Sequence, residues 1–286
     1  MRFAALRTIA SVLPLARRCA LLEVSRSGYY AWCRRGESRR TVTNRMLVGA
    51  IAEVHHTMDR TYGSPRMQQE LVGLGFRCGR HRVARLMQAH GIRAKQARRF
   101  RVTTDSRHGF GIAPNHLGRR FTVPAPNMVW MADVTYLPAA TGWCYLAVVL
   151  DAWSRRVIGW ALDTQITAAL TLAALEQAVN TRRPPFGVLH HSDRGIQYAC
   201  TAYRTALARQ GMVPSMSRRG DCWDNAVVES FFASLKTERT HDRKYTTVEH
   251  AQADVADYID RFYNRQRRHS TLGQLSPAIY ELRHVA

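Results

Sequence analysis

The chain has 286 residues, of which 46% are hydrophobic, and this is enough for one large domain or two modest ones with a buried core. Its formal net charge of +21 predicts a polyanionic partner. Nucleic acid is favoured over a membrane, because the sequence has no lipidation motif, no long basic amphipathic helix and no apolar run of about 20 residues that could cross a bilayer.

The positive charge lies mainly in the first part of the chain. Residues 1–120 contain 24 Lys and Arg against 6 Asp and Glu, whereas residues 121–286 contain 18 against 15. This division predicts a basic region that binds nucleic acid, followed by a domain with a different task.

The six cysteines are scattered and form no C-x-x-C pair, so we expect neither a disulfide framework nor a zinc site. This usage fits a reducing cytoplasm. The apolar start of the chain is short and interrupted by Arg7, and the basic sequence after it suits DNA better than export.

Residues 1–95 are predicted to form a basic helical region. Residues 19–32 predict two short helices joined by a turn, which indicate either a DNA-reading unit or simply a helix pair held by aromatic residues. Apolar residues at helical spacing then predict a longer helix around residues 46–54. The next helix is expected to begin at Ser64 as its cap, with Pro65 at its first position.

A third helix within residues 78–92 completes a helix-turn-helix pattern, in which the second helix of the pair enters the major groove of DNA. Its apolar face leaves basic side chains outside, and we predict that these contact DNA. A solvated basic helix is the plain alternative. The basic side chains concerned are those of Arg80, Arg82 and Arg85.

Residues 96–127 lose helical periodicity and are rich in Arg, Gly and Pro, so we expect a basic linker there. From residue 128 the pattern becomes that of strands. Three strands, a helix, a strand, a helix, a strand and a further helix are expected, which is an α/β order with an antiparallel start and later crossovers. We therefore predict an α/β domain over residues 128–240, built on a mixed five-stranded sheet.

Residues 241–286 predict one more amphipathic helix and a basic tail, NRQRRHS. We predict that Arg267 and His269 in this tail contact DNA, and the alternative is that they only solvate the tail.

Three acidic residues carry the predicted chemistry. Asp133 lies inside the apolar run MVWMADVTYLP, where a buried carboxylate is costly unless it is paired or binds a metal ion. Asp193 follows the apolar run GVLHHS, and Glu229 lies 35 intervening residues later on a helix that starts near DNAVVESFF. Two-metal catalysis on a phosphodiester needs such a carboxylate cluster, which holds two divalent ions about 3.5–4 Å apart. We therefore predict that the three acids hold two Mg²⁺ or Mn²⁺ ions.

Each acid also has a plain structural interpretation. Asp193 beside Gly195 is a common turn pair, and Glu229 is compatible with a solvated helix position. Helical spacing nevertheless places Glu229 at the border of an apolar face, in one stripe with Asn225 and Lys236. We predict that Asn225 and Lys236 contact DNA, with a solvated lysine as the alternative for Lys236.

Other polar residues near these acids are assigned supporting roles. Asp151 follows an apolar run and suits a strand-end cap or salt bridge, and Asp224 is expected to cap the helix that carries Glu229. His190 and His191 have no partner at metal-ligand spacing, so we expect one to be packed and the other to lie near the site.

Five segments together resemble one protein family: MVWMADVTYLP, GWCYLAVVLDAWSRRVIGWAL, HHSDRGIQYAC, SMSRRGDCWDNAVVESFFASLKTE and YNRQRRHSTLGQLSP. They are similar to the transposases of bacterial insertion sequences, and more closely to the second-frame (OrfB-type) product of the insertion-sequence-three family. The resemblance runs from about residue 19 to residue 281.

The resemblance implies a ribonuclease-H-like core of the integrase type, shared with retroviral integrases. It implies that Asp133, Asp193 and Glu229 are the D-D-E metal ligands and that Lys236 matches the family's basic residue on the same helix. Two departures are mild, since Met131-Ala132 precede the first Asp where the family usually has a Thr, and GDCWDN replaces GNCYDN. The zinc-binding N-terminal domain of retroviral integrases is absent, and the helix-turn-helix region takes its place.

The activity that follows is that of a DNA transposase, which binds the terminal repeats of its element, cuts DNA and directs a 3′-hydroxyl onto target DNA. The resemblance also implies a partner, an upstream-frame (OrfA-type) protein that is often joined to this one by frameshifting. A homo-oligomer on DNA, in the cytoplasm at the bacterial nucleoid, is expected. Two rival functions stay open: a metal-dependent nuclease of the same fold that never joins strands, and a non-catalytic DNA-binding regulator.

Overall fold

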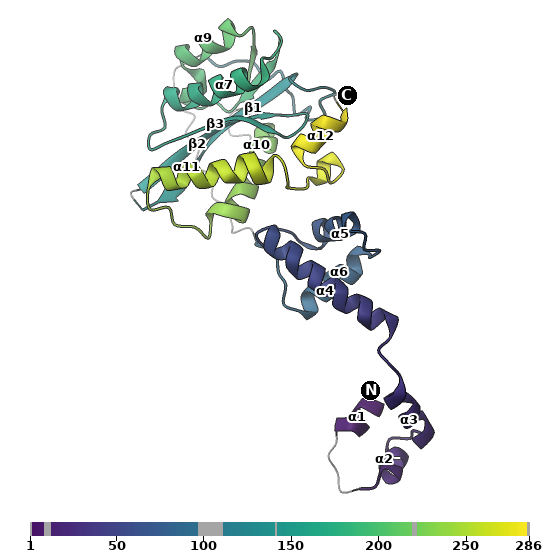
Figure 1. Ribbon diagram of the computed structural model, residues 1–286. Coiled ribbons are helices and arrows are strands. Elements are labelled where there is room, and N and C mark those ends of the chain that lie inside the picture. Colours follow the sequence, from purple (N-terminus) through teal and green to yellow (C-terminus); the bar gives the residue numbers. More distant parts are fainter. Residues whose placement is uncertain (1, 9–12, 97–110, 141, 219–221, 285–286) are drawn as a thin grey trace.

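A mixed five-stranded sheet forms the centre of the second part of the chain (Figure 1). The structure, a computed structural model, describes residues 2–8, 13–96, 111–140, 142–218 and 222–284. The strands are β1 (Val129–Ala139), β2 (Gly142–Asp151), β3 (Val157–Asp163), β4 (Leu189–Ser192) and β5 (Val213–Met216), in the order β3-β2-β1-β4-β5. β1 and β3 pair antiparallel with β2, whereas β4 pairs parallel with β1 and β5. The predicted mixed sheet is therefore confirmed.

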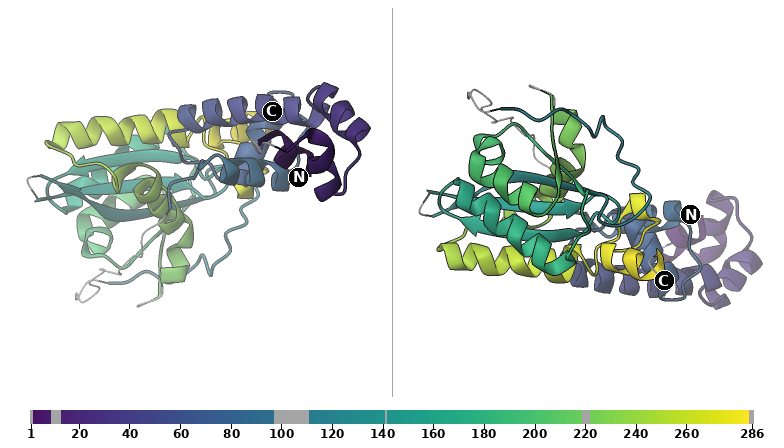
Figure 2. Two further views of the ribbon diagram at one scale, coloured as in Figure 1. Left: turned by 90° about the horizontal axis from the view of Figure 1, so that it is seen from below. Right: turned by 90° about the horizontal axis from the view of Figure 1, so that it is seen from above.

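Side-chain alternation along β1 defines two buried faces of the sheet. Trp130 and Ala132 belong to one apolar core, together with residues of α7 (Ala168–Arg182) and α9 (Thr201–Arg209). Met131 belongs to the other, together with residues of α10 (Ala226–Leu235) and α11 (Val248–Ala256). The two helical layers lie on opposite sides of the sheet (Figures 1 and 2). An added Cβ at Gly159 of β3 would lie 2.2 Å from the carbonyl oxygen of Ala174, so this glycine permits the close approach of α7.

The basic helical region contains the predicted three-helix unit, formed by α4 (Arg39–Thr57), α5 (Ser64–Gly73) and α6 (Arg80–Ala89). Its apolar contacts come from all three helices, as periodicity indicated. One detail differs from the prediction, because the cap of α5 is Gly63 rather than Ser64. Gly63 has the extended backbone of a cap and its carbonyl already accepts the N–H of Met67, so the helix includes Ser64. Gly75 has φ +88°, which favours glycine at the turn before α6.

Three short helices precede this unit: α1 (Arg2–Thr8), α2 (Leu15–Leu21) and α3 (Arg26–Arg34). They include the two short helices predicted around residues 19–32. Ser25 caps α3, since its hydroxyl accepts the backbone N–H of Gly28 at 3.0 Å. Phe3 and Trp32 stack with ring centroids 6.1 Å apart, so aromatic contacts do hold these helices together. Figure 1 shows this small unit set apart from the remainder, joined to it through the start of α4.

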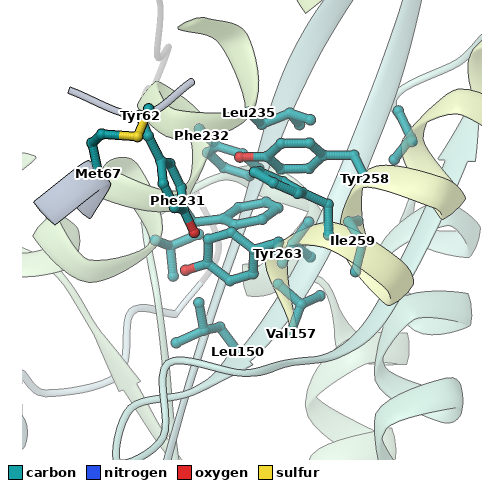
Figure 3. Packing of buried hydrophobic residues seen from close by; sticks show 14 of the residues in the cluster. Tyr62, Met67, Leu150, Val157, Phe231, Phe232, Leu235, Tyr258, Ile259 and Tyr263 are labelled. Atoms are coloured by element: carbon teal, nitrogen blue, oxygen red, sulfur yellow. The ribbon is translucent and has the colours of Figure 1, made fainter. Parts of the chain in front are cut away.

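The three-helix unit and the sheet domain share one apolar core (Figure 3). Tyr62 and Met67 from the basic region belong to the same buried cluster as Phe231 of α10 and Tyr263. The Tyr62 hydroxyl also accepts the backbone N–H of Arg268 at 2.9 Å. The helix-turn-helix unit is therefore packed against the domain that carries the three acids.

A buried ion-pair cluster centred on Glu238 reinforces this junction. Glu238 lies in η2 (Lys236–Thr240), a π-helical turn that continues α10, and is 6% exposed. Its carboxylate accepts from the Arg267 guanidinium at 2.8 Å on each oxygen, from the Tyr258 hydroxyl at 2.8 Å and from Arg66 of α5 at 3.3 Å. Its carbonyl oxygen accepts from Lys95 at 2.7 Å. We call these residues the Glu238 cluster.

The C-terminal part follows the predicted amphipathic pattern, with Val255, Tyr258, Ile259 and Phe262 all buried. The helix changes from α11 into the π-helical segment η3 (Asp257–Tyr263), which periodicity did not predict. Sequence reasoning also missed three helices, α1, α8 (Ile196–Ala199) and α12 (Pro277–His284). All three are shorter than the windows in which helical periodicity can be recognised.

Within the described ranges, no helix is both long enough and apolar enough to cross a membrane. The five cysteines whose side chains are described are all free.

The Glu238 cluster makes a prediction about stability. Arg267→Met should lower the free energy of unfolding by about 3 kcal/mol or more, because it leaves a buried carboxylate without its main partner. Arg261→Met is the matched control, since Arg261 pairs with Asp257 at the surface and should cost less than about 0.5 kcal/mol. Urea unfolding of the full chain measures both. Equal losses for the two variants would contradict the assignment of Glu238 as a buried structural centre.

Candidate active site

The pairing of β1 and β4 brings Asp133 and Asp193 next to each other. Ala132 of β1 is the parallel partner of Ser192 of β4, and each acid is the residue that follows. Neighbouring strands lie about 4.8 Å apart, so the two acids leave the paired segment side by side. Side chains alternate along a strand, so Asp133 lies on the same face of β1 as Met131, the face covered by α10.

Backbone N–H groups hold the two aspartates in place. The Asp133 carboxylate accepts the N–H of Val134 at 2.8 Å. The Asp193 carboxylate accepts the N–H of Gly195 at 2.9 Å, and the Ser192 hydroxyl donates to the Asp193 carbonyl oxygen at 3.0 Å. Asp193 is thus both a turn former and a neighbour of Asp133, so the two interpretations of this residue are compatible.

Glu229 enters the same site from the first turn of α10. Phe231 and Phe232 on the next turn are buried in the core, so the helix is fixed with Glu229 at the border of its apolar face, as predicted. Asn225, which immediately precedes α10, donates its side-chain N–H to the carbonyl oxygen of Ala132 at 3.2 Å. This hydrogen bond ties the start of α10 to the residue before Asp133.

Lys236 immediately follows the C-terminal end of α10. Its ammonium nitrogen is 4.6 Å from the centroid of the Tyr136 ring, a cation–π distance, and the residue is 8% exposed. Burial lowers the pKa of Lys236, and the nearby Asp133 carboxylate raises it in opposition. Lys236 therefore stands beside the acids, as the helical stripe predicted.

The charges of these residues interact across the elements that carry them. Burial is the largest cause that raises the pKa of Asp133, and repulsion from Asp193 and from Glu229 raises it further. The Val134 N–H and the Lys236 ammonium lower it, but the net shift is upward. Burial also raises the pKa of Glu229. The three predicted acids therefore form one negatively charged centre with one cation beside it.

The three acids are not gathered into a single compact cluster. In the ranges that the structure describes, no three Asp, Glu, His or Cys side chains lie close enough together to hold one ion jointly. The donor set itself is suitable, because carboxylate oxygens are the ligands that Mg²⁺ prefers and Mg²⁺ commonly takes only one or two of them, with water and substrate phosphates as the rest.

The remaining residues near the acids have structural roles. His191 hydrogen-bonds the hydroxyls of Ser215 and Ser217 at 2.9 and 3.2 Å, and His190 bonds Tyr203 at 3.1 Å, so both histidines are packed. Burial lowers the pKa of His191 to about 4 and that of His190 to about 3, which leaves both neutral at pH 7.

Asp224 does not cap α10 as expected. Its carboxylate instead accepts from Asn115 at 2.8 Å, from Arg119 at 2.9 Å and from the Arg218 guanidinium at 2.8 Å. Hydrogen bonds from Arg218 are the largest cause that lowers its pKa. A buried acid surrounded by two arginines is better stabilised there than at a helix end, and sequence spacing could not reveal these partners.

The predicted DNA contacts fall into two groups. Arg80 and Arg85 of α6 are exposed, whereas the Arg82 guanidinium is held by the Asn44 side chain at 2.7 and 2.9 Å. The second group is buried. Asn225, Arg267 and His269 are 3%, 5% and 7% exposed, and Arg267 is bound within the Glu238 cluster.

The buried group offers no side-chain surface to DNA in this conformation. The Asn225 side-chain N–H serves an internal contact with Ala132, and the Arg267 guanidinium serves the Glu238 cluster. Burial and the neighbouring Arg267 lower the pKa of His269 to about 2, so it is neutral at pH 7. We therefore do not propose DNA contacts for Asn225, Arg267 and His269.

Comparison with known proteins places this geometry in a class. An integrase core domain matches residues 123–222 and a second integrase core domain model matches residues 210–277, while an HTH-like domain matches residues 43–100. The sheet, α10 and the three acids all lie within the integrase core matches. The chain thus has an integrase core preceded by a helix-turn-helix-like domain, and the ribonuclease-H-like fold class is confirmed.

Curated relatives define the family within that class. An uncharacterised 31 kDa protein of insertion element IS600 from Shigella sonnei is 43% identical over 92% of this chain and 96% of its own length. Transposase InsF of insertion sequence IS3A from Escherichia coli K12 is 40% identical over 94% of each chain. The chain belongs to this family of insertion-sequence transposases. A solved structure of the HTLV-2 integrase catalytic core domain with magnesium aligns over 54% of this chain and 96% of that chain, at 16% identity and a TM-score of 0.42.

The raised pKa of Asp133 predicts how stability changes with pH in the metal-free chain. An acid whose folded pKa lies above its unfolded value costs stability as pH rises from the unfolded toward the folded pKa, and the cost is complete above the latter. Asp133→Asn removes that cost and can keep the Val134 hydrogen bond. Its Tm at pH 7.5 should exceed that of the unaltered chain by about 2–4 °C for each kcal/mol of repulsion relieved, and the gain should shrink as pH falls.

Asp224→Asn is the contrasting control. The pKa of Asp224 is lowered, so its charge stabilises the fold above its unfolded pKa and this contribution is lost as pH falls. The variant should therefore have a lower Tm at pH 7.5. Scanning calorimetry with EDTA present measures both variants, and a lower Tm for Asp133→Asn would contradict the repulsion.

Proposed function

We propose that this chain is a DNA transposase that cuts DNA at the ends of an insertion sequence and joins the freed 3′-hydroxyl to target DNA. The observation that carries the proposal is the electrostatic coupling of Asp133 with Asp193 and Glu229, three acids that come from two parallel strands and one helix. Family membership supports the reaction class.

The proposed cofactor is a pair of Mg²⁺ or Mn²⁺ ions held by Asp133, Asp193 and Glu229. Two observations support the fit. All three ligands are carboxylates, which suit hard divalent cations. Repulsion of the Asp133 carboxylate by Asp193 and Glu229 is an excess of negative charge that a cation would relieve. When bound, two such ions supply activation of the attacking oxygen and stabilisation of the leaving oxygen.

The chain's own residues then hold and orient the DNA. The Asp133 and Asp193 carboxylates leave adjacent strands, so their positions relative to each other are fixed by the sheet. Asn225 fixes the start of α10, and hence Glu229, against β1. We propose that Lys236, although only 8% exposed, contacts a DNA phosphate held beside Asp133. Its ammonium group lies near that carboxylate, and a compact ammonium group binds phosphate as a point charge.

Element-end recognition is proposed for the HTH-like domain. The exposed Arg80 and Arg85 lie on α6, the second helix of the pair, which is the one that enters the major groove in this motif. An upstream-frame OrfA-type partner and a homo-oligomer assembled on the DNA are proposed with this function. The site of action would be the bacterial nucleoid.

The test of the proposal is strand joining by the full chain with its upstream-frame partner protein. A labelled element-end DNA should be joined to target DNA only with Mg²⁺ or Mn²⁺. Asp193→Asn should reduce joining by at least about 10³-fold, because it removes a charged metal ligand, while DNA binding stays unchanged.

Asp163→Asn is a matched control. Asp163 also accepts backbone N–H groups of the residues that follow it, at 2.6 and 3.3 Å, but it is exposed at the end of β3. This variant should join DNA at the normal rate. Joining that survives Asp193→Asn would remove Asp193 from the active site. Cleavage without joining by the unaltered chain would instead favour a nuclease, and transposition by a variant that lacks all three acids would favour a regulator.

A further inference from the structure

A cavity of about 300 Å³ lies at the junction of the HTH-like domain and the integrase core. One wall comes from the turn after α4 and from the segment after α6, and the other comes from η2 and the residues after it. We call it the junction cavity. Five of its lining residues are basic and two are acidic: Arg60, Arg93, Lys95, Arg239 and Arg243, with Asp59 and Asp242.

The bases outnumber the acids, and one carboxylate serves several of them. Asp59 accepts from the Lys95 ammonium at 2.9 Å, while Arg239 and Arg243 each lie 3.9 Å from the same Asp59 oxygen. Arg239 and Arg243 have a second acid, Asp254, in common. The charges of these lining residues are thus largely matched.

Arg60 and Arg93 are different. Both side chains are exposed, and neither forms an ion pair or a side-chain hydrogen bond with any residue in the part of the chain that the structure describes. Two guanidinium groups with open donors, beside bases whose charges are already matched, create a site of positive potential.

The end of α4 fixes the backbone at Arg60. Asp59 and Arg60 both have positive φ, +46° and +58°, the left-handed conformation that commonly ends a helix. The Arg60 N–H donates to the carbonyl oxygen of His55 at 2.8 Å. The Lys95 N–H donates to the Arg60 carbonyl oxygen at 2.9 Å. These hydrogen bonds hold Arg60 on the HTH-like wall of the cavity.

We propose that the junction cavity binds a backbone phosphate of the DNA, through Arg60 and Arg93. This inference rests on the proposed function, because it takes DNA as the polyanion. Guanidinium groups match phosphate oxygens with paired donors, and the contact reads no base, so it fixes position rather than sequence.

The position of the cavity gives the contact a further consequence. Arg60 and Arg93 belong to the HTH-like side, whereas Arg239 follows Lys236 by three residues on the segment that continues the Glu229 helix. A phosphate bound by Arg60 and Arg93 would face the integrase-core wall of the cavity. DNA bound by the HTH-like domain would thereby pass close to the domain that carries the three acids.

The experiment uses the full chain and a double variant, Arg60→Ala with Arg93→Ala. Binding to element-end DNA and to unrelated DNA is measured over a range of salt concentrations. Loss of one phosphate contact should reduce the slope of log K against log salt by about 0.9. Affinity should fall about tenfold at 0.1 M salt, and equally for both DNA sequences, because the contact is to backbone.

Arg183→Ala with Arg209→Ala is the matched control. Arg183 also has a positive φ and Arg209 is an exposed helical arginine, so the control removes the same charge from a similar backbone position far along the chain from the cavity. A double variant whose slope and affinity equal those of this control would overturn the proposal.

Inorganic phosphate separates DNA from a free anion as the source of the phosphate. If phosphate raises the Tm of the unaltered chain but not of the Arg60 and Arg93 double variant, while the DNA salt slopes of both are equal, the cavity is a free-anion site and the proposal is overturned. The proposed function is judged separately by joining in the unaltered chain. Normal joining with no salt-slope change in the double variant removes only the junction cavity from the account.

Discussion

The buried ion pair between Glu238 and Arg267 is the interaction on which the arrangement of the domains depends. Glu238 continues the helix that carries Glu229 and Lys236, and Arg267 comes from the C-terminal segment. Arg66 and Lys95 of the HTH-like domain also bind Glu238, Arg66 through the carboxylate and Lys95 through the carbonyl oxygen. Because a buried carboxylate is tolerated only with such partners, the HTH-like domain, the helix that carries Glu229 and the C-terminal segment are held in one arrangement.

The π-helical turns have a physical role in this arrangement. A π-helical turn inserts one residue more per turn than an α-helix and so changes which side chains face a neighbour. η2 presents Glu238 to Tyr258, which itself lies in the second π-helical segment, η3. The two π-helical segments are therefore joined by the hydrogen bond between Tyr258 and Glu238. Lys236, at the start of η2, lies near Asp133.

The acidic centre shows a conflict between stability and the proposed chemistry. The fold places Asp133 beside Asp193 and near Glu229, where repulsion and burial raise its pKa and destabilise the charged form. The same proximity is what two-metal catalysis requires. A single cation, Lys236, only partly offsets the repulsion, which leaves charge for divalent ions to neutralise.

Much of the fold and of the candidate site could be predicted from the sequence, because it depends on local residue patterns. Alternating apolar residues marked the strands, and the cost of burying Asp133 in β1 marked it as functional. Long-range pairings could not be predicted in the same way. The register of Ala132 with Ser192, the arginines around Asp224 and the partners of Glu238 join residues that are distant in sequence. The same limit explains the three predicted DNA contacts that are buried. Polar residues such as Asn225, Arg267 and His269 are usually exposed, and only tertiary packing buries them here.

The most direct measurement of the central claim is anomalous scattering from Mn²⁺ in crystals of the full chain bound to element-end DNA, since the substrate phosphate completes the coordination. The account predicts two peaks about 3.5–4 Å apart, with carboxylate ligands from Asp133, Asp193 and Glu229. Mn²⁺ peaks elsewhere on the chain, with none contacted by Asp133 or Asp193, would contradict it.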